Sequence, residues 1–365
     1  MLEHGKISAR QLFFILVLIR FVPVMLLCTY SYTLKTVQIA WLNDVLGVAL
    51  SLLYLYLFVR LCKGFKDKTI IEYLESNLGP VFGKIIGIIL VIHFFIIAAS
   101  DARDMGETFT TTIMPETPII VFILIIVFLG ANAARNGLEV IARISEFTVP
   151  IILLFLFITI SLNYKFIDVK NLKPFYFPQG FSELVQPTGS ILSLYIGEFI
   201  IVGMIFPYLN KMQKCSKSVI LATLFTGVLF VILCIDMIVI FGPTFKTLSI
   251  PILSLAKLIF IANFIERIEG IVILSWVLGS AIKIALFLWA TAVGTGQILK
   301  LKSYQPLIYP LGALATVNSI LNYERAADFI NFFTGPWIVY SSTLSISLLI
   351  ILYIAQALDK QKVKS

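Results

Sequence analysis

The sequence predicts an all-α integral membrane protein with about ten transmembrane helices, and two observations carry this prediction. Hydrophobic residues make up 59% of the 365 residues and charged residues only 13%, whereas a soluble domain has roughly a quarter charged. Long apolar runs recur along the chain without the short alternation of a membrane β-barrel, so helices must satisfy the backbone hydrogen bonds in lipid. The first run lacks the flanks of a removable signal peptide, and we expect it to remain as a span.

A transmembrane helix needs about 20 mostly apolar residues. Assigned on that basis, the spans are Gln11–Tyr32, Val37–Leu61, Val81–Ser100, Pro118–Ala133, Phe147–Tyr164, Ser190–Leu209, Val219–Phe241, Gly270–Leu299, Tyr304–Leu321 and Phe332–Ala357. We expect Asn171–Pro187 to be a long outer loop. The apolar segment Thr244–Gly270 is interrupted by a proline and by charged residues, namely Pro251, Lys257, Glu266 and Arg267. We therefore expect it to form a helix that lies across the outer mouth of the bundle and does not cross the membrane.

The distribution of basic residues predicts that both termini are cytoplasmic. With this orientation the inner segments hold seventeen lysines and arginines and the outer segments hold nine. Basic residues are enriched in the cytoplasmic loops of membrane proteins. The same rule explains the net charge of +8, and we expect no nucleic-acid partner.

Motifs for catalysis and for cofactor binding are absent from the sequence. There are four cysteines without paired spacing and two histidines, so we expect no disulfide framework and no metal site. A phosphate-binding GxxxxGK[ST] loop, an HExxH motif and a nucleophile elbow are missing as well. We therefore expect neither an enzyme nor a cofactor.

Three charged residues fall near the middle of predicted spans: Arg20 in the first, Glu198 in the sixth and Lys283 in the eighth. A charge at the centre of a bilayer costs roughly 2.5–3.5 kcal/mol on insertion scales, so such residues face the protein interior or a wet cavity. Because an unpaired buried carboxylate is costly, we expect Lys283 or Arg20 to be the partner of Glu198.

Two of these spans also carry a helix breaker beside the charge. Pro23 follows Arg20, and Gly197 precedes Glu198. Proline removes a helix hydrogen bond, and glycine permits non-helical backbone. Paired interruptions in corresponding spans of two halves indicate a transporter-type binding site. The alternative is that Arg20, Glu198 and Lys283 only neutralise one another inside the bundle.

Other polar positions carry weaker signals. His93, midway along the third span, is either a helix-contact residue or a ligand contact. The "DARD" motif, Asp101–Asp104, is predicted to be a salt-bridged helix end at the outer surface. The "TGPW" motif, Thr334–Trp337, opens the tenth span with a proline near the first helical position.

Several motifs, in order, give the chain a family resemblance. They are "ISARQ" (Ile7–Gln11), "TIIEYLESNLG" (Thr69–Gly79), "ARNGLEVIARISEF" (Ala134–Phe147), "NLKPFYFPQG" (Asn171–Gly180), "GEF" with "FPYLN" in the sixth span, and "NFIERIEG" (Asn263–Gly270). With these motifs the chain resembles the B-subunit family of GerA-type spore germinant receptors, a branch of the amino acid/polyamine/organocation transporter superfamily.

The resemblance implies a LeuT-like fold of two inverted five-helix repeats, here residues 7–164 and 187–357 of one transmembrane domain, with the outer loop 165–186 between them. It implies a ligand site between broken helices one and six, closed by spans three, eight and ten. The site residues implied are Arg20, Phe21, Val22, Pro23, His93, Ile97, Tyr195, Gly197, Glu198, Ile282, Lys283, Thr334, Gly335 and Trp337. Related transporters have a small-residue break in span one, where this chain has "LIRFVPVML".

The function that the resemblance implies is nutrient sensing in the spore inner membrane. The chain would bind a small germinant, usually an amino acid, and act with an A-type and a C-type receptor subunit among membrane lipids. Two other functions stay open on the sequence. One is a proton-coupled amino acid secondary transporter, and the other is a structural assembly subunit without a ligand.

Overall fold

A computed structural model describes residues 2–3, 5–22, 36–65, 67–174, 180–248, 250–259, 269–323 and 325–362. Within these residues the chain is helical, apart from turns and one isolated β-bridge. In the described part of the chain, seven helical segments are long and apolar enough to span a membrane: Val37–Phe65, Pro80–Thr112, Leu138–Leu162, Gly180–Tyr208, Met212–Thr247, Glu269–Ile298 and Ala327–Asp359. The protein is therefore a multi-pass membrane protein.

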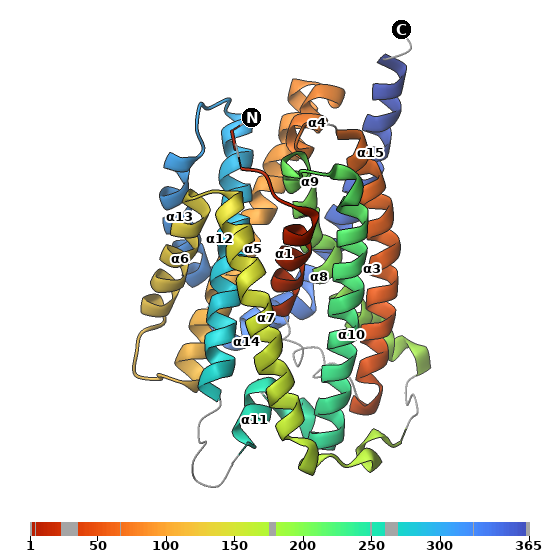
Figure 1. Ribbon diagram of the computed structural model, residues 1–365, viewed down its shortest axis with the longest axis vertical. Coiled ribbons are helices and arrows are strands. Elements are labelled where there is room, and N and C mark those ends of the chain that lie inside the picture. Colours follow the sequence, from red (N-terminus) through yellow and green to blue (C-terminus); the bar gives the residue numbers. More distant parts are fainter. Residues whose placement is uncertain are drawn as a thin grey trace.

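The helices are arranged as an upright bundle (Figure 1). The long ones are α3 (Ala40–Cys62), α5 (Pro80–Thr112), α7 (Leu138–Leu162), α10 (Cys215–Phe241), α12 (Glu269–Ile298) and α15 (Pro336–Lys362). The shorter ones are α1 (Ala9–Phe21), α4 (Ile70–Leu78), α6 (Ile119–Arg135), α8 (Val185–Glu198), α9 (Val202–Ile205), α11 (Pro251–Lys257), α13 (Ile308–Leu321) and α14 (Ala326–Thr334). The N-terminal segment and the end of α15 lie at the same end of the bundle (Figure 1).

Helix α1 begins at a capping box. The Ser8 hydroxyl accepts from the Gln11 backbone N–H, and the Gln11 side chain accepts from the Ser8 N–H. The last residue of the helix is Phe21, and the next residue, Val22, still has helical backbone angles although it precedes a proline. Pro23 itself lies outside the described residues.

The sixth predicted span is interrupted, as expected, immediately after Glu198. Helix α8 passes into a 3₁₀ turn over Phe199–Ile201, which is followed by the four-residue helix α9. A 3₁₀ stretch inside a helix frequently marks a functional hinge. The interruption is a change of helix type and not a fully unwound segment.

The ends of the two broken spans are joined at the end of the bundle where the termini lie. The Ile7 N–H donates to the Tyr208 carbonyl at 2.8 Å, and the Asn210 N–H donates to the Ile7 carbonyl at 2.9 Å. These bonds form the β-bridge between Ile7 and Leu209. The start of the first span is thereby fixed to the end of the sixth.

Burial separates the central helices from the peripheral ones. In Gly180–Tyr208, 89% of the most apolar stretch is buried inside the protein, whereas in Ala327–Asp359 only 28% is buried. The span that carries Glu198 is thus surrounded by other helices, and α15 presents most of its surface to lipid. Glu198 is 2% exposed and does not face the hydrocarbon.

Several predicted boundaries were wrong. The third span continues to Thr112 instead of ending at Ser100, and the fifth begins at Leu138 instead of Phe147. The tenth begins at Pro336, in the first turn, where proline is favoured, since Phe332 belongs to the separate helix α14. Within Thr244–Gly270, where one helix was expected, a short helix forms over Pro251–Lys257, and residues 260–268 lie outside the described part.

Candidate functional site

Glu198 forms two ion pairs with cations from different helices. Its Oε2 accepts from Arg20 Nη1 at 2.8 Å, and its Oε1 accepts from Lys283 Nζ at 2.9 Å. Arg20 comes from the last turn of α1, Glu198 from the end of α8 and Lys283 from the middle of α12. The expected pairing of Glu198 is confirmed with both cations.

A second carboxylate completes the group. Lys283 Nζ also contacts Asp101 Oδ1 on α5 at 2.9 Å. We call Arg20, Asp101, Glu198 and Lys283 the charge cluster. It contains two cations and two anions, so it is formally balanced. All four residues are less than a tenth exposed.

Balance matters because desolvating charge is expensive. A buried ion costs several kcal/mol, which is recovered only by close partners and further hydrogen bonds. Two aromatic rings stabilise the Arg20 cation further, since its guanidinium lies 4.4 Å from the ring centre of Tyr195 and 5.8 Å from that of Phe230. A cation at the C-terminal end of α1 also interacts favourably with the helix dipole.

Gly197, beside Glu198, lets α8 approach α5 and α15 closely. Its carbonyl accepts from His93 Nε2 at 3.0 Å, so that nitrogen carries the proton. A Cβ at Gly197 would lie 2.0 Å from the Ser341 hydroxyl of α15, which already donates to the Ser193 carbonyl. A larger residue here would turn the Ser341 hydroxyl away from its hydrogen bond to Ser193 or push α15 outward.

Aromatic side chains cover the charge cluster. The rings of His93 and Trp337 are stacked, with centres 5.6 Å apart and planes 9° apart. Phe333 lies 5.3 Å from Trp337 and 4.9 Å from Phe329, and both phenylalanines come from α14. We call Phe329, Phe333 and Trp337 the aromatic cover.

A small cavity lies between the charge cluster and the aromatic cover. It is lined by Asp101, Glu198 and Lys283 together with apolar and aromatic side chains that include Ile97, Phe329, Phe333 and Trp337. Its volume is about 10 Å³. That is room for about one water molecule, so an amino acid enters only if the surrounding groups move apart.

The structure brings together part of the predicted site. Arg20, Glu198 and Lys283 belong to the charge cluster, and the residues around them are His93, Ile97, Tyr195, Gly197 and Trp337. Four other predicted residues make their contacts away from the charge cluster.

Phe21 lines a different small cavity beside α7 and α11, and Val22 packs against Gly279 of α12. The Thr334 hydroxyl donates to a carbonyl of its own helix. A Cβ on Gly335 would lie nearest to the Asn331 carbonyl. Ile282 is buried beside Lys283.

The interpretation of "DARD" as an outer helix end was wrong, because α5 continues for two further turns. Asp101 faces the protein interior and pairs with Lys283. A signal for this existed in the sequence, since His93, Ile97 and Asp101 are spaced by four residues and share one face of a helix. Phe329 and Phe333 had no such signal, because their role depends on how α14 lies against α8 and α15.

Another buried carboxylate, Glu3, lies at the end of the bundle that holds the N-terminal segment. Glu3 Oε2 accepts from Tyr304 at 2.7 Å, from Trp289 at 3.0 Å and from the Leu138 N–H at 3.1 Å, and Oε1 accepts from the Gly5 N–H at 2.9 Å. Burial alone raises the pKa of Glu3, but these hydrogen bonds outweigh it and lower the pKa below its ordinary 4.5. The N-terminal segment is thereby attached to α7 and α12.

The fold matches known transporters. One solved structure, of Mhp1, a nucleobase-cation-symport-1 family transporter with bromovinylhydantoin bound, has a TM-score of 0.69 over 92% of this chain and 78% of that chain, at 10% identity. Another, of MhsT in complex with L-phenylalanine, has a TM-score of 0.63 over 97% of this chain and 98% of that chain, at 15% identity. At these identities the likeness establishes a LeuT-like transporter fold.

Sequence comparison gives the family. Spore germination protein KB of Bacillus subtilis (strain 168) is 27% identical over 335 residues, which cover 90% of this chain and 88% of that protein. The family model described as "Spore germination protein" matches residues 6–327. This match extends from the capped start of α1, through all four residues of the charge cluster, to the start of α14. The chain belongs to the spore germination protein family.

Proposed function

We propose that this chain is the germinant-sensing subunit of a spore germination receptor and that the charge cluster is its ligand site. The observation that carries the proposal is the balanced set of two cations and two anions at the interruption of the sixth span. Such a set can accept a zwitterion. A ligand carboxylate would pair with Arg20 or Lys283, and a ligand ammonium would pair with Glu198 or Asp101.

The size of the site supports coupling between binding and conformational change. The cavity of about 10 Å³ is far smaller than an amino acid, so the ligand selects a form in which the aromatic cover has moved away. A ligand that binds only the open form shifts the population toward it. That shift is the signal we propose to be passed to an A-type and a C-type partner subunit.

The topology belongs to the same proposal. We propose that residues 7–164 and 187–357 form the two repeats, with Arg20 and Glu198 at corresponding interruptions. Both termini would face the cytoplasm, and the protein would lie in the spore inner membrane. An amino acid is the proposed ligand because it carries both charges that the site can pair.

A thermal-shift screen of the detergent-purified full chain against the twenty amino acids tests the sensor function. A ligand at 100 times its Kd stabilises by about 2.7 kcal/mol if it binds only the folded state. The hit is expected to disappear in Glu198→Gln and in Lys283→Met. Arg143→Gln is the control, because it removes an exposed cation that pairs with Glu139 away from the site. A hit that both site variants retain would contradict the proposed site.

The transporter-like fold favours one second candidate, a proton-coupled amino acid transporter. The two functions differ in flux and not in binding. Reconstituted vesicles with an imposed proton gradient would accumulate labelled ligand if the chain transports it, and would only bind it if the chain is a sensor. Absence of any ligand for a folded chain would favour a structural subunit whose charges only neutralise one another.

A further inference from the structure

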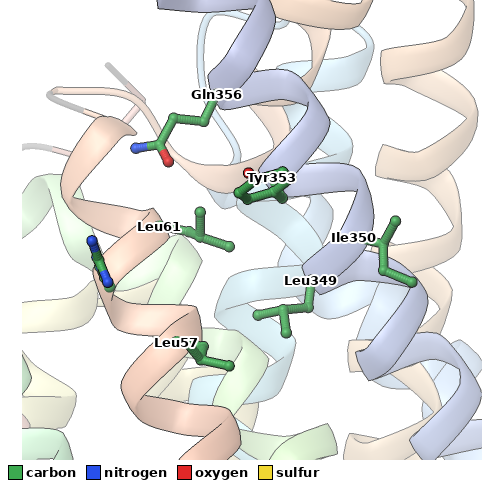
Figure 2. Close-up of a pocket in the computed structure, with 7 residues that line it drawn as sticks. Leu57, Leu61, Leu349, Ile350, Tyr353 and Gln356 are labelled. Carbon is green, nitrogen blue, oxygen red and sulfur yellow. The ribbon is translucent and has the colours of Figure 1, made fainter.

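A groove between α3 and α15 opens toward the lipid at the end of the bundle where the termini lie. Its volume is about 610 Å³, and its walls are Leu57, Arg60 and Leu61 on α3 and Leu349, Ile350, Tyr353 and Gln356 on α15. Figure 2 shows Leu57 and Leu61 on one helix and Leu349, Tyr353 and Gln356 on the other, on the two sides of the space between them. This volume is well over an order of magnitude larger than that of the cavity at the charge cluster.

The two ends of the groove differ in polarity. Leu57, Leu349 and Ile350 form the deeper part, whereas Arg60 and Gln356 lie toward the ends of their helices. Arg60 is two residues from the last residue of α3, which is about 3 Å along the helix axis. The guanidinium therefore lies at the level where headgroups meet the hydrocarbon.

Arg60 is available to an external anion. Its side chain is exposed, and it forms no ion pair with any residue that the structure describes. Lys63 and Lys68, just beyond the end of α3, are exposed as well. Two carboxylates, Asp67 and Asp359, lie near the same end, but neither forms an ion pair with Arg60 in the described part of the chain.

Uncharged donors converge at the same end. A Cβ on Gly64 would lie 3.0 Å from the Gln356 amide nitrogen and 3.7 Å from the Tyr73 hydroxyl, so these two polar groups meet beside the end of α3. The Tyr73 hydroxyl is enclosed by the protein, so of these two groups only Gln356 lines the groove.

The deeper, apolar part of the groove continues into the lipid-facing surface of α3 and α15. Leu53 on α3 is 62% exposed, and Ile346 and Ile350 on α15 are 51% and 57% exposed. An acyl chain that enters between Leu57 and Leu349 therefore runs along apolar side chains for its whole length. One molecule that carries both an apolar chain and an anionic headgroup fits the two parts together.

We propose that this groove is a binding site for one anionic phospholipid. The phosphate lies on Arg60, with the Gln356 amide as a further donor, and an acyl chain lies between α3 and α15. No residue of the charge cluster belongs to this groove, so the lipid site and the proposed germinant site can be tested separately. The lipid would connect α15, which carries Ser341 and Trp337, to α3.

Native mass spectrometry of the detergent-purified full chain tests this site, with phosphatidylglycerol and phosphatidylcholine of identical acyl chains as probes. We expect phosphatidylglycerol to bind more tightly than phosphatidylcholine. One basic residue near a membrane surface contributes about 1 kcal/mol toward anionic lipid, so Arg60→Gln is expected to weaken phosphatidylglycerol binding about fivefold. Phosphatidylcholine binding is expected to weaken by less, because the choline cation already compensates the charge of its phosphate. Lys302→Gln is the matched control, since it removes an exposed cation at the same end of the bundle but away from the groove.

A second variant tests the apolar part without changing charge. Ile350→Trp places a larger side chain in the groove at an exposed position, so folding is preserved while the acyl chain is excluded. It is expected to weaken the binding of both lipids. Equal affinity for the two lipids, or an Arg60→Gln variant that binds like Lys302→Gln, would overturn the proposal. A groove variant that changes only the oligomeric state would also overturn it and would assign the groove to a protein partner.

Discussion

Glu198 holds Arg20 and Lys283 on its two carboxylate oxygens, at 2.8 Å and 2.9 Å, and so joins α1, α8 and α12 at one point inside the membrane. Both cations have neighbours besides Glu198. Lys283 also pairs with Asp101, and Arg20 also lies against the aromatic faces of Tyr195 and Phe230.

Neutralising Glu198 is expected to destabilise the protein strongly. Removing one partner of a buried ion pair leaves an uncompensated charge and costs about 3–5 kcal/mol. Glu198→Gln should lower the melting temperature, and Arg20→Gln in the same chain should restore part of the loss because no unpaired charge remains. A double-mutant cycle measures this coupling. If the loss of stability in the double variant equals the sum of the losses in the two single variants, the pair contributes no coupling energy.

The exposed pair between Arg143 and Glu139 provides the contrast. Both side chains are largely solvent-accessible, at 70% and 41% exposure. Helix-surface pairs contribute about 0.3–0.5 kcal/mol. Arg143→Gln is expected to change the free energy of unfolding by no more than this, measured in the same denaturation experiment as Glu198→Gln.

Adding one methyl group at Gly197 is expected to separate α8 from α15. The new Cβ would meet the Ser341 hydroxyl at 2.0 Å, and overpacking of this kind costs about 1–3 kcal/mol. Ser341→Gly in the Gly197→Ala chain should recover part of the loss because it removes the clashing atom. Gly270→Ala is the control, since nothing lies within 4 Å of a Cβ there. A Gly197→Ala chain as stable as Gly270→Ala would mean that the two helices do not approach as described.

The stability contributed by Glu3 is expected to depend on pH with a definite sign. Because the pKa of Glu3 is lower in the folded chain than its ordinary 4.5, the folded state favours the charged form. The contribution is complete above pH 4.5 and is lost as pH falls through the lowered pKa. The melting temperatures of wild type and Glu3→Gln should thus differ at neutral pH and converge in acid. A difference that grows as pH falls would contradict the assignment.

Shortening Phe333 is expected to open the cavity above the charge cluster. Phe333→Ala removes a ring between Phe329 and Trp337, which makes room beside Asp101 and Ile97. In a cysteine-free chain, Ile97→Cys should react faster with a water-soluble thiol reagent once Phe333→Ala is added. Phe128→Ala, at a lipid-facing position that is 61% exposed, is the control and should leave the rate unchanged.

The helices were predictable because each apolar run is long enough to cross a bilayer, and the partners of Glu198 because a buried carboxylate needs cations. Asp101 was placed wrongly for a physical reason. The end of the apolar run was taken to mark the membrane surface. On α5 the apolar run ends inside the protein instead, because Asp101 forms an ion pair with Lys283 there. The bonds of Glu3 were not predictable, because they join α7, α12 and Tyr304 through a segment without helical periodicity.

The backbone bridge between Ile7 and Leu209 changes how the Arg20–Glu198 pair acts. The first and sixth spans are held together at two heights, once inside the membrane by side chains and once near its surface by main chain. A zwitterion that competes for Arg20, as proposed above, would break the inner attachment and leave the main-chain bridge in place. The two spans would then turn relative to each other about the bridge, so their largest displacement would be expected deep in the membrane, beside Glu198.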